Sequence, residues 1–179
     1  ISTLEIILDI LNKQESHIKK AWELNERHYG ALTGLNKDEM IKKHGNKQVH
    51  IWRRSFDIPP PPMKKTDPNH PSHNTAYTTV PADKIPSGES LKNTFERVIP
   101  YYKENIEPLI SSNKNILISA HGNSLRALCK NLLNISIKQI VDFEIPTGNP
   151  LLISFGKNLE IKKYKYLDNK RAKEILFNV

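Results

Sequence analysis

The spacing of apolar residues along the chain predicts several helices. Over residues 3–12, Leu4, Ile7, Leu8 and Leu11 follow the i, i+3, i+4, i+7 pattern of an amphipathic helix. Helical spacing returns over residues 91–110, where Pro100 predicts a kink. Shorter helices are predicted over residues 37–44, with Asn36 as N-cap and Gly45 as the stop, over 46–54 with Asn46 as cap, over 124–133, and from Ser136 onward.

Strands are predicted where apolar residues run together or alternate. The run N-I-L-I-S-A at residues 115–120 is typical of a buried parallel strand. Residues 151–155 and 160–166 indicate two strands around a turn at 156–158, and residues 18–24 suggest a short strand. Because helices alternate with strands, we expect an α/β fold.

The chain is expected to form a single domain over residues 1–179, with a long loop and a tail. Four consecutive prolines, Pro59 to Pro62, exclude a helix or a central strand. The surrounding residues 57–88 are rich in Pro, Asn, Thr and His, and a loop of this length is usually functional, so we expect a lid or an oligomer contact. Residues 167–179 are expected to form a C-terminal tail or helix.

Composition narrows the class of protein. The formal net charge is +8, from 27 basic and 19 acidic residues, which favours anionic partners. Most of the lysines follow helical patterns and are expected on a solvated surface. We expect no membrane partner, because no apolar run approaches the ~20 residues that span a bilayer, and no nucleic acid, because no aromatic-basic platform is present. A single cysteine, Cys129, fits a reducing cytoplasm.

Three short motifs carry the candidate chemistry. They are Glu26-Arg27-His28-Tyr29, Arg53-Arg54, and the turn His121-Gly122-Asn123 between a predicted strand and a helix. Arginines bind phosphate oxygens with two parallel hydrogen bonds, a carboxylate among cations can transfer protons, and the start of a helix binds anions. Together the motifs predict a phosphate-handling active site.

Each motif also has a simpler interpretation. Glu26 and Arg27 could form a surface ion pair, Arg53, Arg54 and Lys37 could lie on solvated helix faces, and His121 could be structural. Only their joint occurrence favours a site. His70 and His73 have a spacing that could suggest metal ligands, but no Cys or acidic cluster accompanies them, so no metal is expected.

At these motifs the chain resembles the cofactor-dependent phosphoglycerate mutases of the histidine phosphatase superfamily. The resemblance covers nearly the whole chain and rests on these segments: L-N-E-R-H-Y-G-A-L-T-G-L-N-K from Leu24, Q-V-H-I-W-R-R-S-F-D-I-P-P-P-P from Gln48, S-G-E-S-L-K from Ser87, A-H-G-N-S-L-R-A-L from Ala120 and I-P-T-G-N-P-L from Ile145. It implies a three-layer α/β/α fold with a mostly parallel sheet, phosphoglycerates as substrates, 2,3-bisphosphoglycerate as the priming cofactor, a cytoplasmic location, and a homodimer or larger homo-oligomer.

The resemblance also implies roles for individual residues. Glu26 would exchange a proton with the substrate hydroxyl, and His121 would stabilise the transferring phosphoryl group. The substrate and its phosphate would be held by eight residues: Arg27, His28, Tyr29, Lys37, Arg53, Arg54, Gly122 and Asn123. The implied reaction is the glycolytic and gluconeogenic interconversion of 3- and 2-phosphoglycerate through a phosphohistidine.

One part of the family pattern is missing from this sequence. The family begins with a strand that ends in Arg-His-Gly, whose histidine accepts the phosphoryl group, but His44-Gly45 and His121-Gly122 are not preceded by Arg. We expect that first strand to precede residue 1 in a longer enzyme, so that the 179 residues alone are inactive. The alternatives are a non-catalytic anion-binding fragment and a bisphosphoglycerate mutase or phosphatase of the same superfamily.

Overall fold

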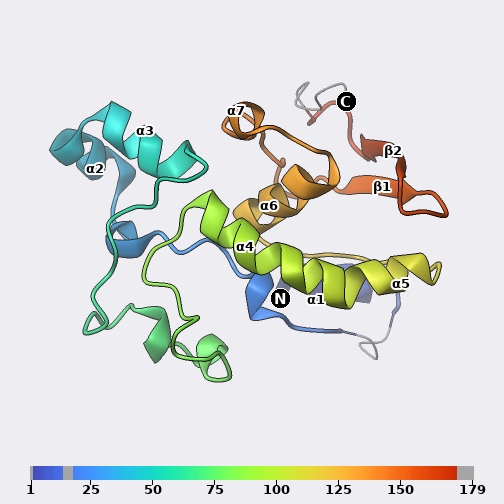
Figure 1. The fold of residues 1–179 in the computed structure, drawn as a ribbon, viewed down its shortest axis with the longest axis horizontal. Coiled ribbons are helices and arrows are strands. Elements are labelled where there is room, and N and C mark those ends of the chain that lie inside the picture. The colour runs from blue at the N-terminus through green and yellow to red at the C-terminus, as the bar shows by residue number, and fades with distance from the viewer. Residues whose placement is uncertain (1, 14–17, 173–179) are drawn as a thin grey trace.

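The structure is a computed structural model that describes residues 2–13 and 18–172. Figure 1 shows a long helical run, α4 to α5, that crosses the molecule with α6 beside it. The helices are α1 (Ser2–Ile10), α2 (Lys37–His44), α3 (Asn46–Arg54), α4 (Leu91–Tyr101), α5 (Glu107–Ser111), α6 (Gly122–Leu132) and α7 (Ile137–Ile140). No helix in this part of the chain is long and apolar enough to cross a membrane.

The core forms where α4 and α6 pack together. Leu91 and Val98 of α4 lie against Ala127 of α6, and Ile140 and Phe143 close the cluster; each of the five is at most 1% exposed. These positions recur at helical spacing, so each helix buries one apolar stripe, which supplies most of its stability. The core therefore fixes the position of α6, whose first residue is Gly122.

The predicted helix ends are largely confirmed because their signals are local. The side chain of Asn36 accepts a hydrogen bond from the backbone of Asp38 and caps α2, and Gly45 ends it with φ +80°. The cap of α3 was predicted one residue late, because Gly45 fills that place and Asn46 is the first helical residue. Ser136 caps α7, as predicted.

The helix predicted over residues 91–110 is present but interrupted. Pro100 lies inside α4, and a π-helical turn, η5 (Tyr102–Ile106), separates α4 from α5. The nitrogen of a proline cannot donate the helical hydrogen bond, so the regular ladder is disturbed near this point. The kink therefore takes the form of a wider turn, and it keeps Tyr102 and Ile106 buried.

The long loop over residues 57–88 is irregular, as predicted, and it is tied to the first motif. It contains two short 3-10 helices, η3 (Pro71–His73) and η4 (Thr75–Tyr77). The backbone of Ala31 donates a hydrogen bond to the carbonyl of Pro61, at 2.8 Å. Gly30 has φ +57°, and a Cβ there would clash with the same carbonyl. Position 30, directly after the motif, therefore requires glycine because the chain passes close to the Pro61 backbone there.

The described sheet has only two strands, β1 (Leu151–Phe155) and β2 (Ile161–Tyr166), which pair antiparallel. This hairpin was predicted, with its second strand beginning one residue later than expected. Two predicted strands were wrong. Residues 115–120 are irregular with no strand partner among the described residues, and residues 18–24 contain a 3-10 helix, η1 (Trp22–Leu24). A strand needs a partner, which residue periodicity does not reveal.

The coarse fold class is nevertheless an α/β arrangement of helices around a small sheet. The predicted parallel sheet is not found in residues 2–13 and 18–172. Residues 115–120, which were wrongly predicted to be a strand, are partly open to solvent, and Leu117 is 55% exposed. The tail prediction lies mostly outside the described residues, because residues 173–179 are not described.

Candidate active site

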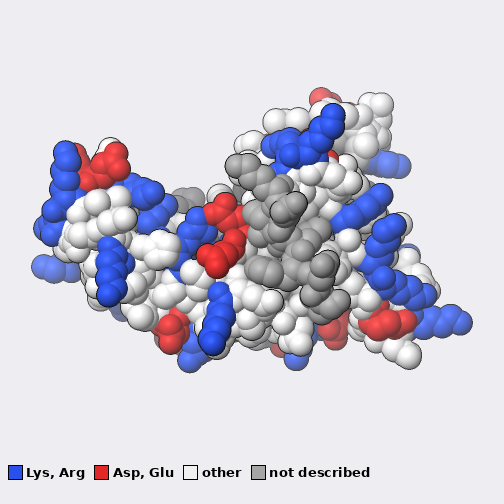
Figure 2. All heavy atoms as spheres, turned by 90° about the horizontal axis from the view of Figure 1, so that it is seen from above, with Lys and Arg blue, Asp and Glu red and all other residues white. Residues whose placement is uncertain are grey.

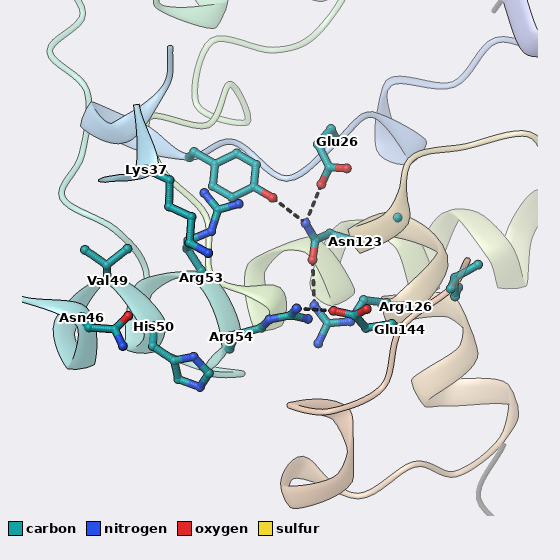
Figure 3. A pocket seen from close by; sticks show the side chains of 13 residues that line it. Glu26, Lys37, Asn46, Val49, His50, Arg53, Arg54, Asn123, Arg126 and Glu144 are labelled. Atoms are coloured by element: carbon teal, nitrogen blue, oxygen red, sulfur yellow. Dashed lines mark hydrogen bonds and ion pairs between the residues drawn. The ribbon is translucent and has the colours of Figure 1, made fainter. Parts of the chain in front are cut away.

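A cavity of about 420 Å³ opens between α3, the start of α6 and the segment that carries the first motif (Figure 3). Four of its residues are cationic, namely Lys37, Arg53, Arg54 and Arg126, whereas only Glu26 and Glu144 are acidic. It is lined by Glu26, Tyr29, Lys37, Asn46, Val49, His50, Arg53, Arg54, Gly122, Asn123, Arg126, Glu144 and Ile145. The excess of positive charge fits an anionic ligand.

Glu26 is held on one wall of the cavity by hydrogen bonds. Its Oε1 accepts from Nδ2 of Asn123 at 2.8 Å and from the backbone N–H of Arg27 at 2.8 Å. Its other oxygen lies 3.8 Å from Nδ1 of His121. The two residues predicted to be catalytic are therefore neighbours, although 95 positions separate 26 from 121 in the sequence.

His121 and Gly122 stand at the N-terminus of α6. His121 is the N-cap residue, with extended backbone and a side chain that is 68% exposed. A Cβ on Gly122 would meet no atom of another segment within 4 Å, so the chain is not packed against this residue on that side. The free N–H groups of the first helical turn can donate hydrogen bonds to an anion at the helix end.

Tyr29 and the arginines form a second wall. The Tyr29 hydroxyl accepts a hydrogen bond from Nδ2 of Asn123 at 3.0 Å. The guanidinium of Arg53 lies over the Tyr29 ring at 5.5 Å from its centroid, which favours a cation through the ring quadrupole. Arg54 forms an ion pair with Glu144, so one of the guanidinium groups on the cavity has a carboxylate partner.

Two of the predicted ligand-binding residues do not line the cavity. Arg27 is 2% exposed and donates to the carbonyls of Trp52 at 3.3 Å and Arg53 at 3.2 Å, at the C-terminal end of α3. The backbone of His28 donates to Glu89 at 2.8 Å. A cation at a helix C-terminus is favoured by the helix dipole, so Arg27 supports the helix that carries the arginines.

Sequence reasoning missed six residues of the lining: the apolar Val49 and Ile145, and the polar or charged Asn46, His50, Arg126 and Glu144. Arg126 could have been found, because it lies three residues after Asn123 on the same face of the helix. Asn46 and His50 follow the same logic before Arg53. Glu144 carried no local signal, because its partner Arg54 is 90 residues away.

Charge on the surface is more diffuse than in the cavity. Figure 2 shows Lys and Arg side chains spread across one face, with acidic groups between them. Such mixing is typical of a solvated surface. The chain carries a net charge of +8, but the basic side chains on this face do not form a single patch.

Comparisons with known proteins place the chain among phosphate-transferring enzymes. The model of the histidine phosphatase superfamily (branch 1) matches residues 62–163. A protein of Hydrogenobaculum sp. (strain Y04AAS1) is 48% identical over 180 residues, which covers 100% of this chain and 73% of that protein. Proteins of Pelagibacter ubique (strain HTCC1062) and Maricaulis maris (strain MCS10) are 51% and 46% identical over 176 residues, covering 98% of this chain and 74% and 72% of theirs. All three are named 2,3-bisphosphoglycerate-dependent phosphoglycerate mutase.

Proposed function

We propose, since this chain belongs to the 2,3-bisphosphoglycerate-dependent phosphoglycerate mutases of the histidine phosphatase superfamily, that it interconverts 3-phosphoglycerate and 2-phosphoglycerate in glycolysis and gluconeogenesis. One observation carries the proposal. Glu26 is held by Asn123 beside His121, on the wall of a cavity lined by four cationic residues. A proton-transfer group, an anion site and a phosphoryl-stabilising group thus meet in one place.

The cavity fits the implied substrates and the bisphosphate. A phosphoglycerate presents a phosphate and a carboxylate, and the guanidinium groups of Arg53 and Arg54 can hold either one through paired hydrogen bonds. Lys37 adds a third cation and Tyr29 a hydroxyl on the same cavity. When bound, 2,3-bisphosphoglycerate supplies the phosphoryl group that primes the enzyme. The same residues would hold it, and no metal is part of the proposal.

Glu26 would act as the general acid and base for the substrate hydroxyl. Its Oε2 is not engaged by Asn123 and lies on the side of His121. His121 would stabilise the phosphoryl group in transfer, with the N–H groups that follow Gly122 as further donors. The phosphoryl-accepting histidine is not assigned to any residue of this sequence.

Arg27 and His28 would have supporting parts in binding. Arg27 lies over the Tyr29 ring at 4.7 Å and holds the end of the helix that carries Arg53. His28 fixes the motif through its backbone bond to Glu89. Both residues would therefore act on the ligand indirectly. Arg27 would act through Tyr29, which its guanidinium contacts and which lines the cavity.

The finer points of fold, assembly and location belong to the same proposal. The fold would be a single domain of three layers with a mostly parallel sheet; the exposed apolar side chain of Leu117 supports a further layer against it. A homodimer or larger homo-oligomer would be cytoplasmic, which the lone buried Cys129 supports. Light scattering after size-exclusion chromatography tests the oligomer, since a strictly monomeric mass would contradict it.

The activity is tested by two rates measured with one preparation of the full-length protein. We expect turnover of 3-phosphoglycerate to 2-phosphoglycerate that requires priming by 2,3-bisphosphoglycerate and exceeds release of inorganic phosphate. Phosphate release as the dominant reaction would point to a phosphatase instead. Ligand binding without either reaction would favour a non-catalytic anion-binding protein.

The role of Glu26 is tested in the same assay. Glu26→Gln keeps the shape of the side chain but cannot transfer a proton, so we expect turnover to fall by about 100-fold or more. Glu39→Gln, on the exposed side of α2, is the matched control and should leave turnover unchanged. Near-normal turnover in Glu26→Gln would remove Glu26 from the mechanism.

A further inference from the structure

Arg126 lies on α6, lines the cavity and makes a specific contact with Asn123. Its side chain is buried, with 6% exposure. Its Nη1 donates to Oδ1 of Asn123 at 2.9 Å (Figure 3), and its Nη2 donates to the carbonyl of Ile140. The guanidinium is thus anchored at one end to the backbone and at the other to an amide that faces the site.

This contact determines which way the Asn123 amide faces. The oxygen and nitrogen of an asparagine side chain are nearly equal in shape, so packing alone does not choose between them. A guanidinium has donors only, so its partner on Asn123 must be the oxygen. The amide nitrogen is then directed into the cavity, where it donates to Oε1 of Glu26 at 2.8 Å and to the hydroxyl of Tyr29 at 3.0 Å.

We propose that Arg126 is a positioning residue of the reaction: it locks the Asn123 amide so that its nitrogen, and not its oxygen, meets Glu26 and Tyr29. The proposal rests on the proposed role of Glu26 in proton transfer. Without Arg126 the amide can turn over and set its oxygen against the Glu26 carboxylate, which repels it. Glu26 would then leave the geometry that the reaction needs.

A purely structural role does not explain this residue well. Burial and the nearby Arg54 and Arg27 lower the pKa of the Arg126 guanidinium to about 10, with Glu144 as the opposing charge. The Nε of Arg126 is buried and has no hydrogen-bond partner. Burying a charged group costs free energy unless the group is fully paired and hydrogen-bonded. A buried guanidinium with a lowered pKa and an unpartnered Nε is therefore better explained by a role in positioning Asn123 than by stability alone.

The kinetic test compares three variants of the full-length protein. Arg126→Met fills the same space without a donor, and we expect kcat to fall by about 10- to 100-fold, which exceeds the rise in KM from the loss of one cation in the cavity. Arg126→Lys restores one donor and should recover part of kcat. Lys130→Met is the matched control, because Lys130 also lies on α6 and donates to a backbone carbonyl, at 2.6 Å to Ile135, but does not contact Asn123. An unchanged kcat in Arg126→Met, or an equal loss in Lys130→Met, would overturn the proposal.

A second measurement reads the amide directly and does not depend on activity. The side-chain amide signal of Asn123 is identified by its loss in Asn123→Asp, and its hydrogen exchange is followed by NMR. We expect slow exchange in the wild type, exchange at least about tenfold faster in Arg126→Met, and slow exchange in Lys130→Met. Unchanged exchange in Arg126→Met would refute the locking. A wild type without mutase turnover would refute the proposed function, while the exchange data would still decide the locking.

Discussion

Arg97 binds Glu89 through two hydrogen bonds, from Nε to Oε1 at 2.7 Å and from Nη2 to Oε2 at 3.0 Å. The side chains are only 9% and 5% exposed. Arg97 also donates to the carbonyls of Asn25 and Glu26, and Glu89 accepts from the backbone of His28. The pair therefore joins α4 to both sides of the residue proposed to transfer protons.

Removal of this guanidinium is predicted to destabilise the fold and the site together. Arg97→Met leaves the Glu89 carboxylate buried without its cation, so the free energy of unfolding should fall by about 3 kcal/mol, measured by urea denaturation. Lys92→Met is the control, because its pair with Glu96, at 4.0 Å, is exposed and should contribute less than about 1 kcal/mol. Equal losses in the two variants would show that the buried Arg97–Glu89 pair contributes no more to the free energy of unfolding than an exposed ion pair.

The crossing of the first motif over the prolines predicts a sharp difference between two glycines. Gly30→Ala forces an alanine to φ +57° and sets its Cβ against the carbonyl of Pro61, so we expect a loss of at least about 2 kcal/mol. Gly34 has a similar φ of +77° but no atom within 4 Å of a Cβ. Gly34→Ala should therefore cost only about 1 kcal/mol. Thermal melting of both variants measures the difference, and similar melting points would contradict the predicted clash.

Glu144 is predicted to compete with anionic ligands for Arg54. Glu144→Gln removes the carboxylate that is paired with this guanidinium, so we expect 3-phosphoglycerate to bind about fivefold more tightly. Titration calorimetry at low and high salt checks this, and the gain should shrink as salt screens the charges. Glu104→Gln, on the exposed side of η5, should change nothing. Weaker binding in Glu144→Gln would mean that the carboxylate orients Arg54 for the ligand.

Stability is predicted to fall at mildly acidic pH because the partly buried His28 and the buried His70 resist protonation in the folded state. Burial lowers the pKa of His28 and of His70 below the ordinary 6.5. In both rings Nδ1 accepts a backbone N–H, from Gly30 at 3.1 Å and from Ser72 at 3.1 Å, so a proton there would break the bond. The charged or titratable groups near them are Glu89 and His70 for His28, and His73, Lys65 and Asp67 for His70.

The sign follows from proton uptake. Below pH 6.5 the unfolded chain binds protons that the folded histidines resist, so the free energy of unfolding should fall as pH decreases from 7.5 to 5.5. Urea denaturation at both values measures the fall. His70→Asn should reduce the difference, whereas His50→Gln, which changes an exposed ring, should not. If the pH dependence of stability is unchanged in His70→Asn, His70 does not contribute to it.

The features predicted correctly from the sequence are those whose signals lie within a few residues. Asn36 caps α2 and Ser136 caps α7 because each needs only the next two or three residues. The strand predicted over residues 115–120 was wrong, because strand pairing depends on other segments of the chain. Glu26 and Arg27 show the same limit within the site. Both adjacent side chains were expected at the ligand, but the fold turns Glu26 into the cavity and buries Arg27 behind it.

The hydrogen bond between Asn123 and Glu26 joins residues 97 positions apart. Contacts of such long separation close large loops, and the entropy of that closure opposes them until other native contacts form. We therefore expect the cavity to be complete in the fully folded state and incomplete in partly folded chains. A bound phosphoglycerate would draw the population toward the fully folded state, by an amount that grows with its concentration over its Kd. In a cell rich in this metabolite, the substrate itself would act as a folding aid for its enzyme.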